Sequence, residues 1–128
     1  MPIPAGWSPR LLSLFRIVFG LMFLSHGVSK LFGLPPFPHP LTPLLHIAGV
    51  LELVGGALIL AGWWTRPIAF LLSGEMAVAY FMAHVPQGLL PLVNGGEAAI
   101  LYCFAFLYLA AAGAGPWSLD ALRRGDDQ

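Results

Sequence analysis

The stretch Leu11–Leu31, LLSLFRIVFGLMFLSHGVSKL, decides the fold class of this chain. It is a nearly continuous apolar run of about 20 residues, the length that an α-helix needs to cross the hydrocarbon core of a bilayer. Arg16, His26 and Lys30 nevertheless interrupt this run. An ionisable group inside a spanning helix is costly and normally faces other helices, where it finds a partner. The run therefore predicts a membrane helix with one polar stripe that faces a bundle.

The composition of the whole chain agrees with a membrane protein. Of the 128 residues, 58% are hydrophobic and only 9% are charged, and the mean hydropathy is +0.80. Soluble domains carry about a quarter charged residues, so this chain lacks the charged surface that such a domain needs. We expect the lipid bilayer to surround most of the chain, and we expect no nucleic-acid partner.

Four apolar runs, separated by breaks that contain proline or glycine, predict four membrane spans. The predicted spans cover residues 11–31, 44–63, 67–85 and 97–114. The chain is expected to fold as a single domain, residues 1–128, of the all-α class. The expected architecture is an integral membrane four-helix bundle.

Basic residues set the expected orientation, because short loops rich in Lys and Arg tend to stay in the cytoplasm. Four arginines fall on one side of the predicted spans: Arg10, Arg66, Arg123 and Arg124. Lys30 is the basic residue on the other side. Both termini are therefore predicted to be cytoplasmic.

The ionisable residues of the predicted spans suggest pairs between helices. Arg16 and Glu75 lie at similar estimated heights, within ~4.5 Å along the helix axes, and so do His26 and Glu52. We predict a buried Arg16–Glu75 ion pair. This pair either contributes to function or only holds the bundle in one register. Lys30 lies at the outer boundary, where its ammonium group could extend into the headgroup region instead of serving a site.

All histidines of the chain fall on the predicted outer side: His26, His39, His46 and His84. One interpretation is a quinone site, where a donor polarises a carbonyl oxygen and a nearby acid supplies protons. The other interpretation is that these are ordinary interfacial histidines. A metal site is disfavoured, because no H-x-x-x-H or E-x-x-H spacing places two ligands on one helical face. Haem is disfavoured because no secure pair of axial ligands is evident.

The sequence NGGE, Asn94–Glu97, also has two interpretations. Asn94 is a good helix N-cap, and Glu97 could complete a capping box. The two glycines also leave backbone exposed near the outer histidines, where a ligand could approach closely. The candidates for ligand binding are His26, Lys30, His46, Glu52, His84, Asn94 and Glu97.

Six short motifs occur in order along nearly the whole chain: HGVSKLFG, GVLELVGG, TRP, GEMAVAYFMAH, NGGEAAILY and GPWSLD. In this order they resemble the DoxX family of small four-helix bacterial membrane proteins. The resemblance implies a protein of the bacterial inner membrane. It also implies a relation to subunits linked with thiosulfate and quinol oxidation and to membrane partners of redox-defence enzymes.

The predicted function is that of a membrane component of a quinone-linked redox system with an outward-facing polar pocket. No covalently bound cofactor is expected. The sequence has no flavin motif, and its single Cys103 excludes a two-thiol redox motif. An oxidoreductase activity would therefore need a protein partner or further copies of the chain. The alternative is a non-enzymatic carrier of a small solute, or a membrane assembly protein.

Overall fold

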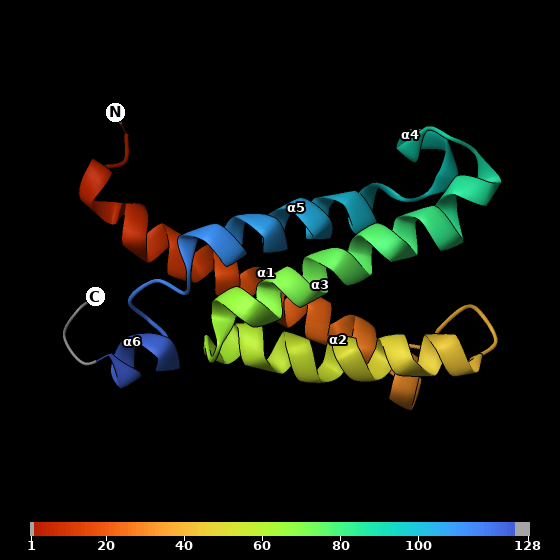
Figure 1. The fold of residues 1–128 in the computed structure, drawn as a ribbon, viewed down its shortest axis with the longest axis horizontal. Helices are drawn as coiled ribbons and strands as arrows, with labels where there is room; N and C mark the ends of the chain where they lie inside the picture. The colour runs from red at the N-terminus through yellow and green to blue at the C-terminus, as the bar shows by residue number, and fades with distance from the viewer. Residues whose placement is uncertain (1, 125–128) are drawn as a thin grey trace.

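The computed structural model describes residues 2–124, which fold mostly into helices (Figure 1). In chain order the elements are η1 (Ala5–Trp7), α1 (Ser8–Phe32), α2 (Pro43–Ala61), α3 (Thr65–Ala79), η2 (Tyr80–His84), η3 (Val85–Gln87), α4 (Pro91–Asn94), α5 (Glu97–Ala112) and α6 (Leu119–Arg123). No strand occurs within the described range. The all-α prediction is therefore confirmed.

Three helical segments are long and apolar enough to cross a membrane: Ala5–Phe32, Pro43–Ala61 and Thr65–Gln87. They overlap the first three predicted spans. The fourth predicted span corresponds to α5, which has 16 residues. A helix of this length is roughly 24 Å long, shorter than the ~30 Å hydrocarbon core. The structure thus supports three spans by length and composition, and the fourth stays a prediction.

Local sequence explains where α1 ends and where α2 begins and ends. Gly33 ends α1 and Gly62 ends α2, with φ of 70° and 71°. Glycine adopts this left-handed conformation without a steric penalty. Thr42 caps α2 by accepting a hydrogen bond from the Leu45 N–H, and Pro43 occupies the first turn.

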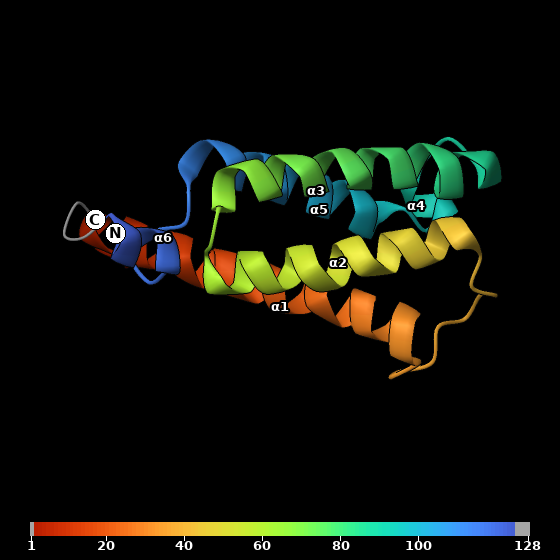
Figure 2. The ribbon, with the colours of Figure 1, turned by 60° about the horizontal axis from the view of Figure 1, so that its bottom comes forward.

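The four long helices pack as two pairs. Helix α1 packs mainly against α2, and α3 packs mainly against α5, while α2 and α3 join the two pairs. All four run along the long axis of the molecule (Figures 1 and 2). The start of α1, the α2–α3 turn and α6 lie at one end, which we call the terminal end. The α1–α2 loop and α4 lie at the opposite end, which we call the loop end.

Four glycines let α1 and α2 approach closely. Gly20 and Gly27 of α1 face α2, and Gly49 and Gly56 of α2 face α1. A Cβ atom added at Gly56 would lie 2.7 Å from the backbone nitrogen of Leu24, which is closer than real side chains come. These four residues, the glycine seam, therefore allow the backbones to touch, as small residues do in membrane helix packing.

Aromatic side chains join α1 to α5 across the bundle. The Phe23 ring lies 5.2 Å from the Tyr102 ring and 4.8 Å from the Phe106 ring, measured between centroids. Leu72 and Met76 of α3 belong to the same buried cluster. This cluster places Tyr102 beside α1, although α1 and α5 each pack mainly against another helix.

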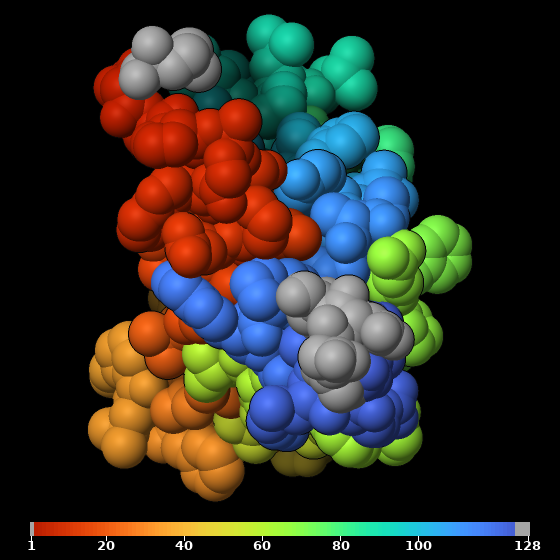
Figure 3. All heavy atoms as spheres, turned by 90° about the vertical axis from the view of Figure 1, so that its left-hand side faces the viewer, coloured from red at the N-terminus to blue at the C-terminus, as the bar shows by residue number. Residues whose placement is uncertain are grey.

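The segment after α5 folds across the terminal end, where it lies in front of the start of α3 (Figure 3). The Asp120 N–H donates to the Gly62 carbonyl at 2.8 Å, and the Trp117 N–H donates to Ser13 Oγ at 3.1 Å. This segment therefore contacts both α1 and the α2–α3 turn, and it closes the bundle at this end.

Candidate functional site

Lys30 and Glu52 form an ion pair inside the bundle. The Lys30 Nζ atom lies 2.7 Å from both carboxylate oxygens of Glu52, and Glu52 is 1% exposed. Glu52 lies in the middle of α2, and Lys30 reaches it from the last turns of α1. Because α1 and α2 approach closely at the glycine seam, the Lys30 side chain can reach the Glu52 carboxylate. Lys30 thus points into the bundle and not into the headgroup region.

A second carboxyl group, from Glu75 of α3, lies near Glu52, whose charge acts on it. The Lys30 charge also acts on Glu75. The Oε1 atom of Glu75 is buried and has no hydrogen-bond partner among the described residues. We call Lys30, Glu52 and Glu75 the carboxyl–lysine cluster.

His26 and Tyr102 lie next to this cluster. Their rings meet edge-on with centroids 5.6 Å apart, and the charges of Glu52 and Lys30 act on the His26 imidazole. Tyr102 is buried and also experiences the Glu52 charge. His26 itself is exposed on the surface of the chain. The structure thus places His26 close enough to Lys30 and Glu52 for their charges to interact, with His26 on the exposed side.

Arg16 binds backbone carbonyl groups. Its guanidinium group donates to the Ile59 carbonyl at 2.9 Å, to the Trp117 carbonyl at 2.7 Å and to the Ala114 carbonyl. Ile59 lies in the last turn of α2, where carbonyl groups lack helical partners and attract a cation. Arg16 therefore ties the end of α2 to the segment after α5.

The predicted Arg16–Glu75 ion pair is wrong. The carboxylate whose charge acts on Arg16 is that of Asp120, whereas Glu75 lies beside Glu52. Similar height along the helix axes is a necessary condition for a pair, but each side chain must also face the other helix. Arg16 faces the end of α2, and Glu75 faces the middle of that helix.

Asn94 and His84 organise the loop end. Asn94 is 4% exposed, and its Nδ2 donates to the Gly88 carbonyl at 2.8 Å and to the Tyr80 hydroxyl at 3.1 Å. Its Oδ1 accepts from the Gly96 N–H at 2.8 Å. His84 Nδ1 lies 3.1 Å from the Asn94 carbonyl oxygen. These contacts hold the turn between α3 and α5.

The predicted capping box at Asn94–Glu97 is wrong. Helix α5 begins at Glu97 with Gly96 as its N-cap and without a side-chain cap, and Asn94 ends α4. Glu97 and His46 are both exposed. Within residues 2–124, no three His, Cys, Asp or Glu side chains are grouped so that they could hold a metal ion.

Glu75 and Tyr102 are the residues of this site that sequence reasoning misplaced or missed. The height estimate pairs Glu75 with Arg16 and leaves Tyr102 unused. The signal for Tyr102 is a hydroxyl group inside the apolar run 97–114, which begins at the last residue of the NGGE motif. Its ring belongs to the buried core, and its proximity to His26 depends on how α5 packs beside α1.

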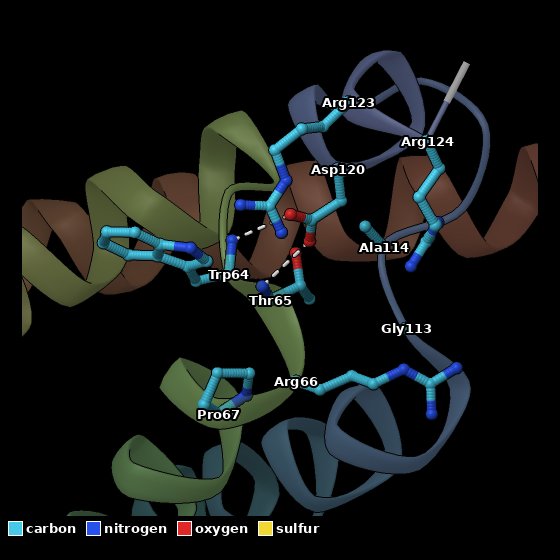
Figure 4. Close-up of a pocket in the computed structure, with 9 residues that line it drawn as sticks. All are labelled: Trp64, Thr65, Arg66, Pro67, Gly113, Ala114, Asp120, Arg123 and Arg124. Carbon is cyan, nitrogen blue, oxygen red and sulfur yellow. Dashed lines mark hydrogen bonds between the residues drawn. The ribbon is translucent and has the colours of Figure 1, made fainter.

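Asp120 holds the start of α3 at the terminal end (Figure 4). Its carboxylate oxygens accept hydrogen bonds from the N–H groups of Trp64 and Thr65, both at 2.9 Å. Trp64 has φ of 52°, which residues other than glycine seldom adopt, so the contact secures an unusual turn. Burial alone would raise the pKa of Asp120, but the hydrogen bonds and the nearby Arg123 outweigh burial and lower this pKa below its ordinary value.

Comparison with known proteins places this fold in a family. The DoxX family model matches residues 11–85. An uncharacterized protein of Haemophilus influenzae is 44% identical over 125 residues, covering 89% of this chain and 91% of that protein. A second uncharacterized protein of the same organism is 34% identical over 90 residues, covering 68% of this chain and 60% of its own length. No solved structure matches. The family model, which covers more than half of the chain, shows that the chain belongs to the DoxX family of small membrane proteins.

Proposed function

We propose that this chain is a membrane component of a quinone-linked redox system. In this proposal the carboxyl–lysine cluster binds the polar head of a lipid-soluble quinone and exchanges protons with it. The observation that carries the proposal is the Lys30–Glu52 pair, whose carboxylate lies in the middle of α2, a helix long enough to span a membrane. Ionisable groups inside membrane spans are costly and commonly mark paths for protons or ligands.

The side chains around the cluster match the needs of quinone chemistry. Lys30 and His26 can donate hydrogen bonds to a quinone carbonyl oxygen. Glu75, which lies beside Glu52, can hold a proton that moves to or from the ligand. The Tyr102 ring packs against His26, and its hydroxyl group is a further donor on this residue. This set can bind a polar head and change its protonation.

Access from the lipid side supports a hydrophobic ligand. His26 is exposed, and so are its apolar neighbours Leu21 and Met22 on the same helix. An imidazole that faces hydrocarbon is unfavourable unless another polar group meets it. A quinone head that lies against His26 and Tyr102, with its tail among the lipid chains, would supply that group.

Electron transfer in this proposal requires a partner. Oxidation of a quinol releases protons and electrons in equal number. The carboxyl groups of the cluster receive the protons one at a time, and the electrons pass to a flavin, haem or iron–sulfur cofactor of a partner subunit. The chain then contributes the quinone site and the proton path, and the partner contributes the redox centre.

A quinone titration of the purified full-length chain tests the proposal. Binding of a short-tailed quinone analogue is followed by quenching of tryptophan fluorescence in detergent. We expect His26→Ala to weaken binding about tenfold, the effect of losing one hydrogen bond to the ligand, and Glu52→Gln to weaken it at least as much. His39→Ala removes an exposed imidazole of the α1–α2 loop and should bind as the parent does.

Thermal unfolding of the same samples separates loss of the site from loss of the fold. Unchanged quinone affinity in folded His26→Ala and Glu52→Gln proteins would contradict the proposal. That result would favour the alternative class, a non-enzymatic carrier or assembly protein in which the cluster stabilises the bundle.

A further inference from the structure

A separate cavity lies at the terminal end, away from the carboxyl–lysine cluster. It has a volume of about 240 Å³ and lies between the start of α3, the segment after α5, and α6 (Figure 4). Three arginines contribute to its lining: Arg66, Arg123 and Arg124. A neighbouring cavity of about 500 Å³ shares Arg66 and Arg124 with it. Arginine side chains are therefore concentrated around these two adjoining cavities.

The smaller cavity is positively charged. Asp120 also lines it, but both of its carboxylate oxygens accept hydrogen bonds from the Trp64 and Thr65 N–H groups. The Arg66 Nη1 atom donates to the Ala111 carbonyl at 2.8 Å. A guanidinium group has five N–H donors, so Arg66 can bind an anion while it keeps this bond. Three guanidinium groups against one carboxylate leave the lining positive and rich in donors.

We propose that this cavity binds a phosphate group, carried by the headgroup of an anionic phospholipid or by free phosphate. The planar guanidinium group matches two phosphate oxygens at once, which makes arginine the preferred side chain for this anion. Gly113 supports the same arrangement, because a Cβ atom there would lie 3.2 Å from the Arg66 Nη2 atom. Because Gly113 has no side chain, the Arg66 guanidinium group fits beside the backbone that follows α5.

The setting suits a lipid headgroup. Trp64 and Trp117 are 51% and 50% exposed at this end, and tryptophan prefers the headgroup level of a membrane. Arg66 follows Trp64 by two residues at the start of α3. These tryptophans favour a position of the cavity at the level of the lipid phosphate groups.

The test measures ligand-induced stabilisation of the full-length protein. The protein is purified in neutral detergent, stripped of lipid, and titrated with phosphatidylglycerol, phosphatidylcholine or inorganic phosphate while the thermal unfolding midpoint is recorded. We expect phosphatidylglycerol to raise the midpoint and phosphatidylcholine, whose choline group neutralises its phosphate, to have no effect. A rise with phosphatidylglycerol alone assigns the site to lipid, and an equal rise with inorganic phosphate assigns it to the free anion; both outcomes support the proposal.

Matched arginine variants test the position of the site. Arg66→Gln and Arg123→Gln should each weaken phosphatidylglycerol binding about tenfold, the effect of losing one charge-assisted hydrogen bond. Arg10→Gln is the control, because Arg10 lies at the same end over the Trp7 ring and belongs to neither cavity lining. Equal weakening in Arg10→Gln and Arg66→Gln would overturn the proposal, since it would show only diffuse surface attraction.

A second measurement uses the unmodified protein, in case a variant does not fold. The protein is supplied with equal amounts of phosphatidylglycerol and phosphatidylcholine, and the retained lipid is identified by native mass spectrometry. Preferential retention of phosphatidylglycerol, or bound inorganic phosphate in its place, supports the site. Equal retention of both lipids, with no bound phosphate, overturns it.

Discussion

At Glu52, one buried carboxylate meets an ammonium group from α1 and a carboxyl group from α3. A charge at this position is removed from water, and only its neighbours can compensate for the lost solvation. Lys30 compensates Glu52 directly. Glu75 gives Lys30 a second carboxyl group within range. The two glutamates should therefore replace each other in part.

This redundancy predicts non-additive stability losses. Glu52→Gln and Glu75→Gln should each be tolerated, because one carboxyl group remains for Lys30. The double variant leaves Lys30 without a carboxylate and should lose about 3 kcal/mol, more than the sum of the single losses. Unfolding by denaturant in detergent micelles measures these free energies. Exposed Glu97→Gln should change nothing, and additive losses at Glu52 and Glu75 would show that the two carboxyl groups act separately.

Arg16 should not be replaceable by lysine. The guanidinium group reaches the carbonyl groups of Ile59, Ala114 and Trp117 at once, and a lysine ammonium group cannot match this fork. We expect Arg16→Lys to destabilise the fold by about 3 kcal/mol, measured by unfolding in detergent. Arg10→Lys, at an exposed position, is the matched control. A loss no larger than that of the control would show that the carbonyl contacts contribute little.

Asp120 predicts a pH dependence at the acid end. Its pKa is lower in the folded protein than the ordinary value of about 3.9, so its contribution to stability is fully present above that value. The contribution is lost as the pH falls through the lower, folded-state pKa. We therefore expect a drop in the unfolding midpoint of the parent below about pH 4. Asp120→Asn should have a lower midpoint at neutral pH and a smaller drop, and parallel curves would contradict this assignment.

At the scale of the elements, the pairing of α1 with α2 depends on the glycine seam. Gly56→Ala would place a Cβ atom 2.7 Å from the Leu24 backbone nitrogen, so the helices would have to separate. We expect a loss of about 1–3 kcal/mol in the free energy of unfolding. Gly74→Ala is the matched control, since a Cβ at this helical position meets nothing within 4 Å. A similar loss in both variants would mean that the seam does not set the helix separation.

The helices could be predicted from sequence because length, hydropathy and breakers are local properties. Gly33, Gly62 and Pro43 stand where the apolar runs are interrupted, and they end or begin helices in the structure. The partners of Arg16 and Glu75 could not be predicted in this way. They depend on how each helix is rotated about its axis. They also depend on backbone carbonyl groups of the segment after α5, and a pattern of side chains does not reveal these acceptors.

At the scale of the whole molecule, α1 begins and α6 ends at the terminal end (Figure 1). The same end carries the arginines on which the orientation was predicted, including Arg66 and Arg123. A chain that starts and finishes on one face of a membrane must cross it an even number of times. Helix α5 would then be the fourth crossing, despite its 16 residues.

This arrangement predicts both termini in the cytoplasm and the loop end outside the bacterial inner membrane. Reporter fusions after Gln87 and at the C-terminus should report opposite sides, because basic loops remain cytoplasmic. A fusion before Ser8 should agree with the C-terminal one. Reporters at Gln87 and the C-terminus on the same side would reject the fourth crossing.

The contacts of Arg16 with Ala114 and Trp117 also bear on how the chain is made. Arg16 is synthesised well before two of its partners, which follow it by 98 and 101 residues in the chain. The first helices can therefore enter the membrane before the guanidinium group has its full set of acceptors. Closure of the terminal end has to wait until Ala114 and Trp117 have been made, and a chain truncated after Ala112 cannot reach it. In such a chain Arg16 would keep its acceptors at the end of α2 but lose those after α5, and the open terminal end would be accessible to the proteases that survey newly inserted membrane proteins.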